Sequence, residues 1–281
     1  MIGARRMCRN VTKLPIRIVS LPNANNPAAV DLRDRVVIVT GATGGLGRPL
    51  AVACAAAGAT VILHARVVRK LEVLYDEITG AGHPEPVILP LDLAKADAAD
   101  FANVAAALEA QLGRLDALVH TADMLGSLGP LEHQSFESWL ALLRVNLAAP
   151  MGLTRALMPL LSAADDASVV FTLDNRGQEP RAYWGGYAVT KAGLATLARE
   201  LADEWENRPK LRVNAVVPGP IRSPLRGKTH PAEDASLLPS PASLVPLYLH
   251  LIAGQPKADS GALIDAQAWL AGASSVASLR A

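Results

Sequence analysis

Two kinds of segment alternate along this chain from Arg35 onward, and this alternation restricts the fold more than any other feature. Short runs rich in valine, isoleucine and leucine are each followed by a longer stretch in which apolar residues recur with the period of a helix. This order predicts β-α-β units that build one parallel sheet. The expected strands are Arg35–Thr40, Thr60–His64, Pro86–Leu91, Ala117–His120, Ser168–Leu173, Arg212–Val217 and Ala262–Asp265.

The stretches between the strands predict helices over Leu46–Ala57, Val68–Gly80, Asp97–Leu112, Glu137–Leu161, Gly185–Asn207 and Pro241–Ala253. The fourth should break near Pro150, because proline cannot donate a hydrogen bond inside a helix. The pattern predicts an α/β fold of three layers, α/β/α, around a seven-stranded, doubly wound parallel sheet. At 281 residues the chain has room for a single domain of this kind.

We place this domain at residues 31–281 and interpret residues 1–30 as a flexible N-terminal extension. Basic residues precede the first acid, Asp31, in this extension: Arg5, Arg6, Arg9, Lys13 and Arg17. They could form a transit segment or an anion-binding arm, but a chain end without packing partners is usually mobile.

The composition excludes several classes of protein. A hydrophobic content of 51% with 19% charged residues is typical of a compact protein, and a net charge of +1 is too small to select nucleic acid. Two cysteines and six scattered histidines predict neither a disulfide framework nor a metal site. The nearly apolar stretch Pro49–Leu63 is shorter than the ~20 residues that cross a bilayer. We therefore expect a small-molecule substrate, no nucleic acid, membrane or metal partner, and a cytoplasmic location.

A proline-rich segment, Arg222–Ser240, is the only long irregular region between a strand and a helix. A loop of this length often covers a ligand, so we interpret it as a substrate-covering loop. Its basic residues are consistent with an anionic substrate, although a solvated loop surface explains them more simply; they are Arg222, Arg226, Lys228 and His230.

A glycine-rich turn joins the first strand to the first helix, with the sequence Gly41-Ala42-Thr43-Gly44-Gly45-Leu46-Gly47. Glycines let the backbone approach a pyrophosphate, and the helix N-terminus offers free N–H groups and partial positive charge. The order of strand, turn and helix favours a dinucleotide site over a simple tight turn, with Gly41, Thr43, Gly45, Leu46 and Gly47 as its candidate residues.

The end of the second strand indicates which dinucleotide would bind. NAD-binding folds carry an acid there for the ribose 2′-hydroxyl, whereas NADP needs a cation for the 2′-phosphate. The chain has Arg66 and no acid, which favours NADP(H). After the third strand, Asp92 and Leu93 lie where an adenine could bind; Asp92 could equally cap the next helix.

Tyr187 and Lys191 are four residues apart in a predicted helix, so their side chains share one face. A cation beside a phenol lowers the phenol's pKa, by ~1–3 units in this arrangement, and a tyrosine of this kind can exchange a proton near neutral pH. The pair predicts an acid/base site for reduction of a carbonyl group.

With the turn Thr40-Gly41-x-x-x-Gly45-x-Gly47, the Tyr187/Lys191 pair and Pro218-Gly219 after the sixth strand, the chain resembles the classical short-chain dehydrogenase/reductase family from Asp31 to about Gln267. The resemblance implies a single-domain Rossmann fold, a homodimer or homotetramer, and NADP(H)-dependent interconversion of an alcohol and a carbonyl.

The resemblance also implies roles for single residues. Tyr187 would be the acid/base, Lys191 would bind the nicotinamide ribose, and Asn146 would hold a water in the proton relay. Arg66 and Asp92 match the family's 2′-phosphate and adenine positions. The remaining candidate cofactor contacts are Ala122, Pro218, Gly219, Ile221 and Ser223, with Ile221 and Ser223 expected at the nicotinamide carboxamide.

Two positions depart from the family pattern. Asp174 occupies the place of the family's catalytic serine, and losing a donor to a developing oxyanion typically costs ~10²–10³ in rate; its carboxylate would also raise the pKa of Tyr187. Thr172, Asn175 or a protonated Asp174 could supply a donor instead. Asp123 replaces a glycine near the cofactor, where it could change how the adenosine ribose is held. These departures leave an alternative open, an NADP(H)-binding protein with little or no turnover that acts as a sensor or structural partner.

Overall fold

The computed structural model describes residues 30–254, 260–272 and 276–278, so the N-terminal extension with its basic residues lies outside the described part. One sheet runs through the protein in the order β3-β2-β1-β4-β5-β6-β7-β8. The seven predicted parallel strands are confirmed, and a short antiparallel strand, β8, is added at the edge. The strands are β1 Val36–Thr40, β2 Thr60–Ala65, β3 Val87–Pro90, β4 Ala117–His120, β5 Ala167–Thr172, β6 Leu211–Val217, β7 Ala262–Asp265 and β8 Val276–Ser278.

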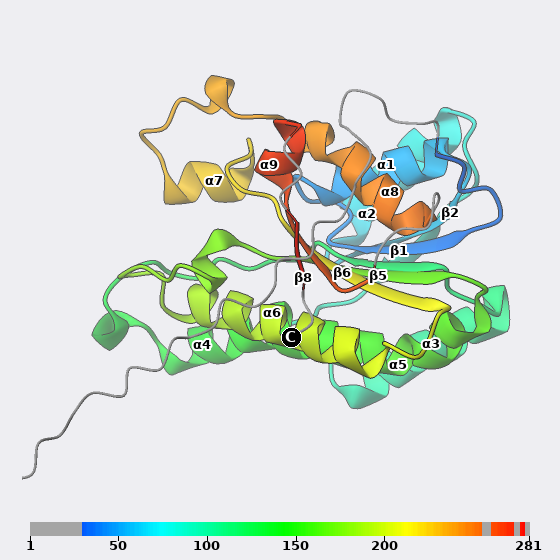
Figure 1. Ribbon diagram of the computed structural model, residues 1–281, viewed down its shortest axis with the longest axis horizontal. Helices are drawn as coiled ribbons and strands as arrows, with labels where there is room; N and C mark the ends of the chain where they lie inside the picture. The colour runs from blue at the N-terminus through cyan, green and yellow to red at the C-terminus, as the bar shows by residue number, and fades with distance from the viewer. Residues whose placement is uncertain (1–29, 255–259, 273–275, 279–281) are drawn as a thin grey trace, which may run out of the picture.

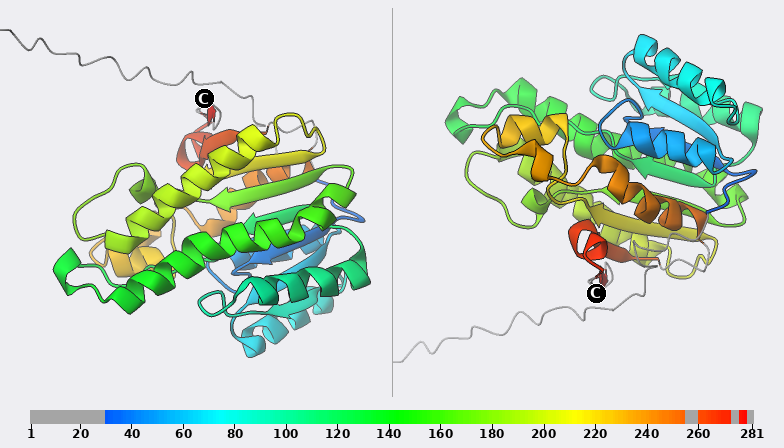
Figure 2. Two further views of the ribbon diagram at one scale, coloured as in Figure 1. Left: turned by 90° about the horizontal axis from the view of Figure 1, so that it is seen from below. Right: turned by 90° about the horizontal axis from the view of Figure 1, so that it is seen from above.

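Helices cover both faces of the sheet, which gives the expected three-layer α/β/α Rossmann fold (Figure 1). Helices α1, α2 and α8 lie over one face, and α3, α5 and α6 lie over the other; Figure 2 shows each layer from its own side. The helices are α1 Gly47–Ala56, α2 Val68–Gly80, α3 Ala98–Leu112, α4 Phe136–Leu143, α5 Ala149–Ala163, α6 Gly185–Glu204, α7 Pro224–Thr229, α8 Val245–Ala253 and α9 Ala266–Leu270.

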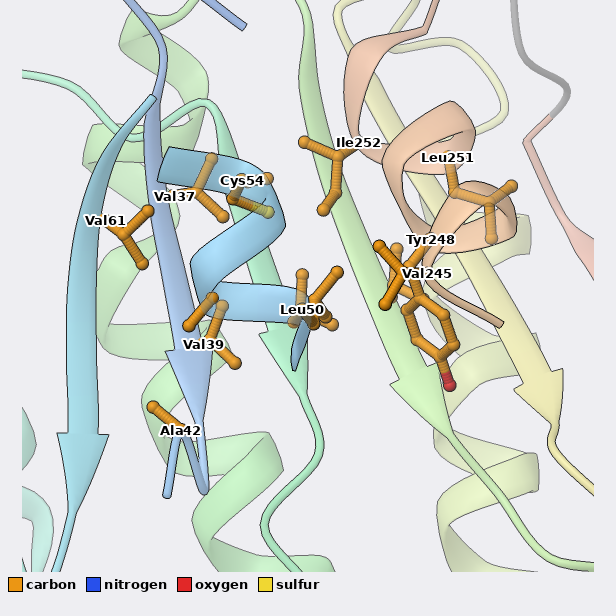
Figure 3. Packing of buried hydrophobic residues seen from close by; sticks show 14 of the residues in the cluster. Val37, Val39, Ala42, Leu50, Cys54, Val61, Val245, Tyr248, Leu251 and Ile252 are labelled. Atoms are coloured by element: carbon orange, nitrogen blue, oxygen red, sulfur yellow. The ribbon is translucent and has the colours of Figure 1, made fainter. Parts of the chain in front are cut away.

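The core on the first face is built where α1 and α8 lie side by side on the sheet (Figure 3). Leu50 of α1 and Leu251 of α8 are at most 1% exposed, as is Val39 on β1. Burial of one such side chain contributes about 1.5–3 kcal/mol. Together these contacts keep the carboxyl end of β1, where the glycine turn begins, in one position.

Besides β8 and the short helix α9, which were not predicted, two regions differ from the prediction. The expected long helix Glu137–Leu161 is α4, a π-helical turn at Arg144–Ala148 and α5, so the irregularity precedes Pro150, which fits in the first turn of α5 where its missing N–H has no cost. The segment Arg222–Ser240 contains the short helix α7 and a 3₁₀ turn at Ala235–Leu237. Pro224 at the first turn of α7 and the Ser223 side chain, which accepts from Arg226 N–H, explain why a helix starts there.

The segment Ala235–Ala253 has the length and mean hydropathy of a candidate membrane span. Its helical part, α8, belongs to the core described above, and seven of its nine residues are buried. We therefore interpret this segment as a core element of the fold.

Candidate active site

A cavity of about 610 Å³ opens at the carboxyl ends of the parallel strands. It lies where the strand order reverses between β1 and β4, which is the usual ligand position in a doubly wound sheet. The glycine turn and Arg66 line one end and Tyr187 lines the other. The predicted site residues that line the cavity are Gly41, Thr43, Gly45, Leu46, Arg66, Leu93, Ala122, Asp174, Tyr187, Pro218, Gly219, Ile221 and Ser223.

The glycine turn is packed so tightly that two of its positions have no space for a side chain. A Cβ on Gly47 would lie 2.2 Å from the carbonyl oxygen of Gly41. Gly41 itself has φ +67°, and its Cβ would lie 2.8 Å from the Cα of Ala122. The turn therefore brings bare backbone to the cavity wall at the start of α1, as binding of a pyrophosphate requires.

A buried threonine joins the glycine turn to the end of β4. The hydroxyl of Thr40 accepts from the N–H groups of Thr121 and Ala122 at 3.1 and 3.2 Å. In addition, His64 Nδ1 accepts from the Gly41 N–H at 3.3 Å. These contacts position the turn relative to the segment that carries Asp123.

The end of β2 presents cations to the cavity. Arg66 and Lys70, which is one turn further along the chain at the start of α2, both line it and are both exposed. Asp92 does not line the cavity, and its side chain accepts from the Ala94 N–H at 3.2 Å, so its adenine contact stays a prediction. The alternative role of Asp92 as a helix cap is wrong, since Asp97 caps α3.

Tyr187 and Lys191 lie one turn apart on α6, as predicted, with side chains 1% and 3% exposed. Their environment differs from the expectation, because Asp123 lies between them. The Tyr187 hydroxyl donates to Asp123 Oδ2 at 3.0 Å, and Lys191 Nζ lies 3.2 Å from Asp123 Oδ1. Asp123 is thus part of the acid/base site, and its expected effect on the adenosine ribose stays a prediction.

Asp174 approaches the same phenol from the end of β5. The Tyr187 hydroxyl lies 3.3 Å from Asp174 Oδ2, and the other oxygen of Asp174 accepts from the Arg176 N–H at 2.7 Å. Two carboxylates therefore compete for one phenol proton.

The prediction of a lowered pKa for Tyr187 beside Lys191 is wrong for this arrangement, whereas the predicted effect of the Asp174 carboxylate is confirmed. Burial and the nearby charges of Asp123 and Asp174 raise the pKa of Tyr187 well above its usual value. Lys191 is instead paired with Asp123, whose own pKa is raised by its removal from water, while Lys191 opposes that rise. The phenol is consequently held in its protonated form.

Two residues that could replace the family's serine as hydrogen-bond donor, Thr172 and Asn175, have different surroundings. The Thr172 hydroxyl lies 2.9 Å from the Tyr248 hydroxyl on α8, so it is used within the core, while its carbonyl accepts from Lys191 Nζ at 3.3 Å. Asn175 lines the cavity and is exposed.

Asn146 lies in the π-helical turn and does not line the cavity. Its side chain accepts from the Met124 N–H at 2.9 Å and donates to the Met124 carbonyl at 2.8 Å. This paired contact holds the backbone next to Asp123, and it is a positioning role that the sequence did not indicate; the water role of Asn146 stays a prediction.

The basic residues of the expected covering loop are largely committed to the protein itself. Arg222 donates to the carbonyl groups of Ala235 and Leu238, and Arg226 forms an ion pair with Glu233. Because these two guanidinium groups are bonded within the protein, they give little support to an anionic substrate. The wall beside Tyr187 is aromatic, with Trp184 at 5.7 Å between ring centroids.

Known proteins resemble this chain over most of its length. Residues 35–234 match the family model described as short chain dehydrogenase. The uncharacterized oxidoreductase YciK of Escherichia coli is 37% identical over 236 residues, which are 84% of this chain and 93% of that protein. A solved short chain dehydrogenase from Shigella flexneri complexed with NADP has a TM-score of 0.81 at 36% identity, covering 85% of this chain and all of the other. One from Escherichia coli complexed with NADPH has a TM-score of 0.82 at 37% identity, covering 86% and 100%.

Proposed function

Because this chain belongs to the short chain dehydrogenase family, we propose that it is an NADP(H)-dependent oxidoreductase that interconverts an alcohol and a carbonyl on a small molecule. One observation carries the proposal: a single cavity is lined both by the bare backbone of the glycine turn and by Tyr187. The domain boundaries at 31–281 and a cytoplasmic location stay predictions.

The cofactor assignment is supported by the residues at the end of β2. Arg66 and Lys70 place two cations beside the glycine turn, and the guanidinium of Arg66 suits bidentate contact with a 2′-phosphate. Similar proteins were solved with NADP and with NADPH. When bound, the cofactor supplies or accepts the hydride.

The chain's own residues supply the proton and the orientation. Tyr187 is the proposed acid/base, since its hydroxyl lines the cavity and carries the proton. Lys191 is the proposed ribose contact and would have to exchange part of its pairing with Asp123 for that role. Ile221 and Ser223 line the cavity between the glycine turn and Tyr187 and are proposed to hold the carboxamide.

The alternative, a cofactor-binding protein with little turnover, is favoured by one specific observation. The proton of Tyr187 is directed at two carboxylates, and Asp174 stands where the family has a neutral hydroxyl donor. Single-turnover hydride transfer from NADPH to a panel of ketones, and from alcohols to NADP⁺, tests both functions. Turnover by the wild-type protein supports the oxidoreductase; a silent wild type with activity gained in Asp174→Ser supports the alternative.

We also propose assembly as a homodimer or homotetramer through the layer of α4, α5 and α6. Large apolar side chains of this layer are exposed, namely Phe136, Leu140, Met151 and Val189. Sedimentation of the protein tests the assembly, and a monomer at micromolar concentration contradicts it.

A further inference from the structure

The carboxylates around Tyr187 bear on which substrates the proposed hydride transfer would favour. Asp123, Asp174 and Tyr187 all line the same cavity, and they come from the ends of β4 and β5 and the first turn of α6. The three groups therefore face any substrate that reaches the phenol.

The charges in this cluster do not balance. Lys191 neutralises Asp123 at 3.2 Å, whereas Asp174 forms no ion pair within the part of the chain that the structure describes. Arg176, Arg226 and Lys228 also line this cavity, but none of them forms an ion pair with Asp174 in the described residues: the guanidinium of Arg176 lies over the ring of Trp184 at 4.9 Å, and Arg226 pairs with Glu233. Asp174 thus presents to the substrate a negative charge that no ion pair compensates.

This charge opposes reduction of a ketone. Hydride addition to a neutral carbonyl develops negative charge on oxygen, which needs neutral or cationic donors close by. Here the phenol proton points at Asp123 and Asp174, at 3.0 and 3.3 Å, so a ketone oxygen would have to draw it away from two anions.

The same charge suits a substrate that is already cationic. We propose that the favoured substrate carries a protonated imine, the nitrogen counterpart of a carbonyl, and that the carboxylate of Asp174 holds it in the protonated form. This inference rests on the hydride transfer and the cofactor of the proposed function, and it replaces the C=O bond of the substrate by a C=N⁺ bond. The carbon of the C=N⁺ bond accepts a hydride from the reduced nicotinamide, a C–H bond forms, the π electron pair moves to nitrogen, and the product is a neutral amine with oxidised cofactor.

No proton has to leave Tyr187 in this step, since the proton on nitrogen is present before the hydride arrives. The amine is then protonated by solvent. The raised pKa of Tyr187 is consistent with a phenol that stays protonated and donates a hydrogen bond throughout.

The test compares cyclic imines, which persist in water, with ketones of the same ring size, for example 2-methyl-1-pyrroline with 2-methylcyclopentanone. Single-turnover oxidation of NADPH is followed in the full chain. We expect the wild type to favour the imine by at least ~10²-fold in rate and Asp174→Ser to lose most of that preference. The matched control is Asp165→Ser, because Asp165 is an exposed acid just before β5, at its opposite end, and should leave the preference unchanged.

A second measurement does not depend on turnover or on a variant. Cyclopentylamine, a cation, and cyclopentanol, its neutral counterpart, are titrated by calorimetry into the wild type saturated with NADPH, and we expect the amine to bind at least ~10-fold more tightly. Ketone reduction without imine reduction, or equal binding of the two probes, overturns the inference and leaves the proposed function intact. Binding of NADPH with hydride transfer to neither class overturns both.

Discussion

The hydroxyl of Tyr187 lies 3.0 Å from the carboxylate of Asp123, although 64 residues separate them in the chain. The contact exists because β4 and β5 are neighbours in the sheet, so the segments that follow them meet α6 at one edge. It changes the expected chemistry of the site, since the charge of Asp123 contributes to raising the pKa of Tyr187, which Lys191 was expected to lower.

Replacement of Tyr187 by phenylalanine should separate chemistry from binding. General acid–base catalysis by one side chain contributes ~10²–10⁴ in rate, so we expect Tyr187→Phe to reduce single-turnover hydride transfer to a ketone by that factor. The affinity for NADPH, measured by calorimetry, should change by less than about threefold, because the glycine turn is distant along the cavity. A large loss of affinity with unchanged chemistry would assign Tyr187 to binding alone.

Asp123→Asn should shift the pH dependence of ketone reduction. The carboxylate raises the pKa of Tyr187, so its removal should lower that pKa and move the alkaline decline in kcat/KM to lower pH. The check is a pH profile of the variant beside that of the wild type. Asp203→Asn, a change in an exposed acid near the end of α6, is the control, and an equal shift in both variants would contradict the contact.

Two buried histidines should make the fold sensitive to moderate acid. Burial lowers the pKa of His64 to about 4 and that of His120 to about 3, from 6.5. At pH values between these lowered pKa values and 6.5, the unfolded chain binds protons that the folded chain does not. The free energy of unfolding therefore falls as the pH falls below 6.5. We expect a loss of about 2 kcal/mol per histidine between pH 7 and pH 5.

Urea unfolding at the two pH values measures this loss. His120→Gln should reduce it by about 2 kcal/mol, even if the variant is less stable at pH 7. His133→Gln, at an exposed histidine, should leave the loss unchanged. A loss that is the same in all three proteins would contradict the burial of a neutral His120.

Gly47→Ala should damage both the fold and the cofactor site. Its Cβ would lie 2.2 Å from the Gly41 carbonyl oxygen, so the turn must move, and a well-packed region resists such insertions by about 1–3 kcal/mol. We expect a lower Tm and a loss of NADPH affinity of at least ~10-fold. Gly80→Ala in α2, where a Cβ meets nothing within 4 Å, is the matched control; it should lower neither measurement, because alanine is the better helix former.

The fold could be predicted from the sequence because each strand is a short apolar run and each helix shows its own period. The prediction failed where an element is too short to show such a pattern: β8 has three residues and α7 has six. The π-helical turn at Arg144–Ala148 also has no signature in apolar spacing, since the helix merely widens by one residue there.

The candidate site was predicted in its parts and not in its contacts. Gly41, Arg66 and Tyr187 were found because each residue type suits its chemistry at its place in the strand and helix order. The contact of Asp123 with Tyr187 depends on the order of the strands in the sheet, which local sequence does not state. Asp123 and Asp174 each follow a predicted strand, so placing those two strands side by side would have predicted that the two carboxylates lie close together.

All the predictions on catalysis depend on the binding of a phosphorylated dinucleotide between Arg66 and Tyr187. Calorimetric titration of the full chain with NADPH and with NADH, each at two temperatures, tests it most directly, with Arg66→Ala as the variant. We expect saturable binding of NADPH, at least ~10-fold weaker binding of NADH, and loss of that difference in Arg66→Ala. Absence of binding by either nucleotide at both temperatures would contradict it.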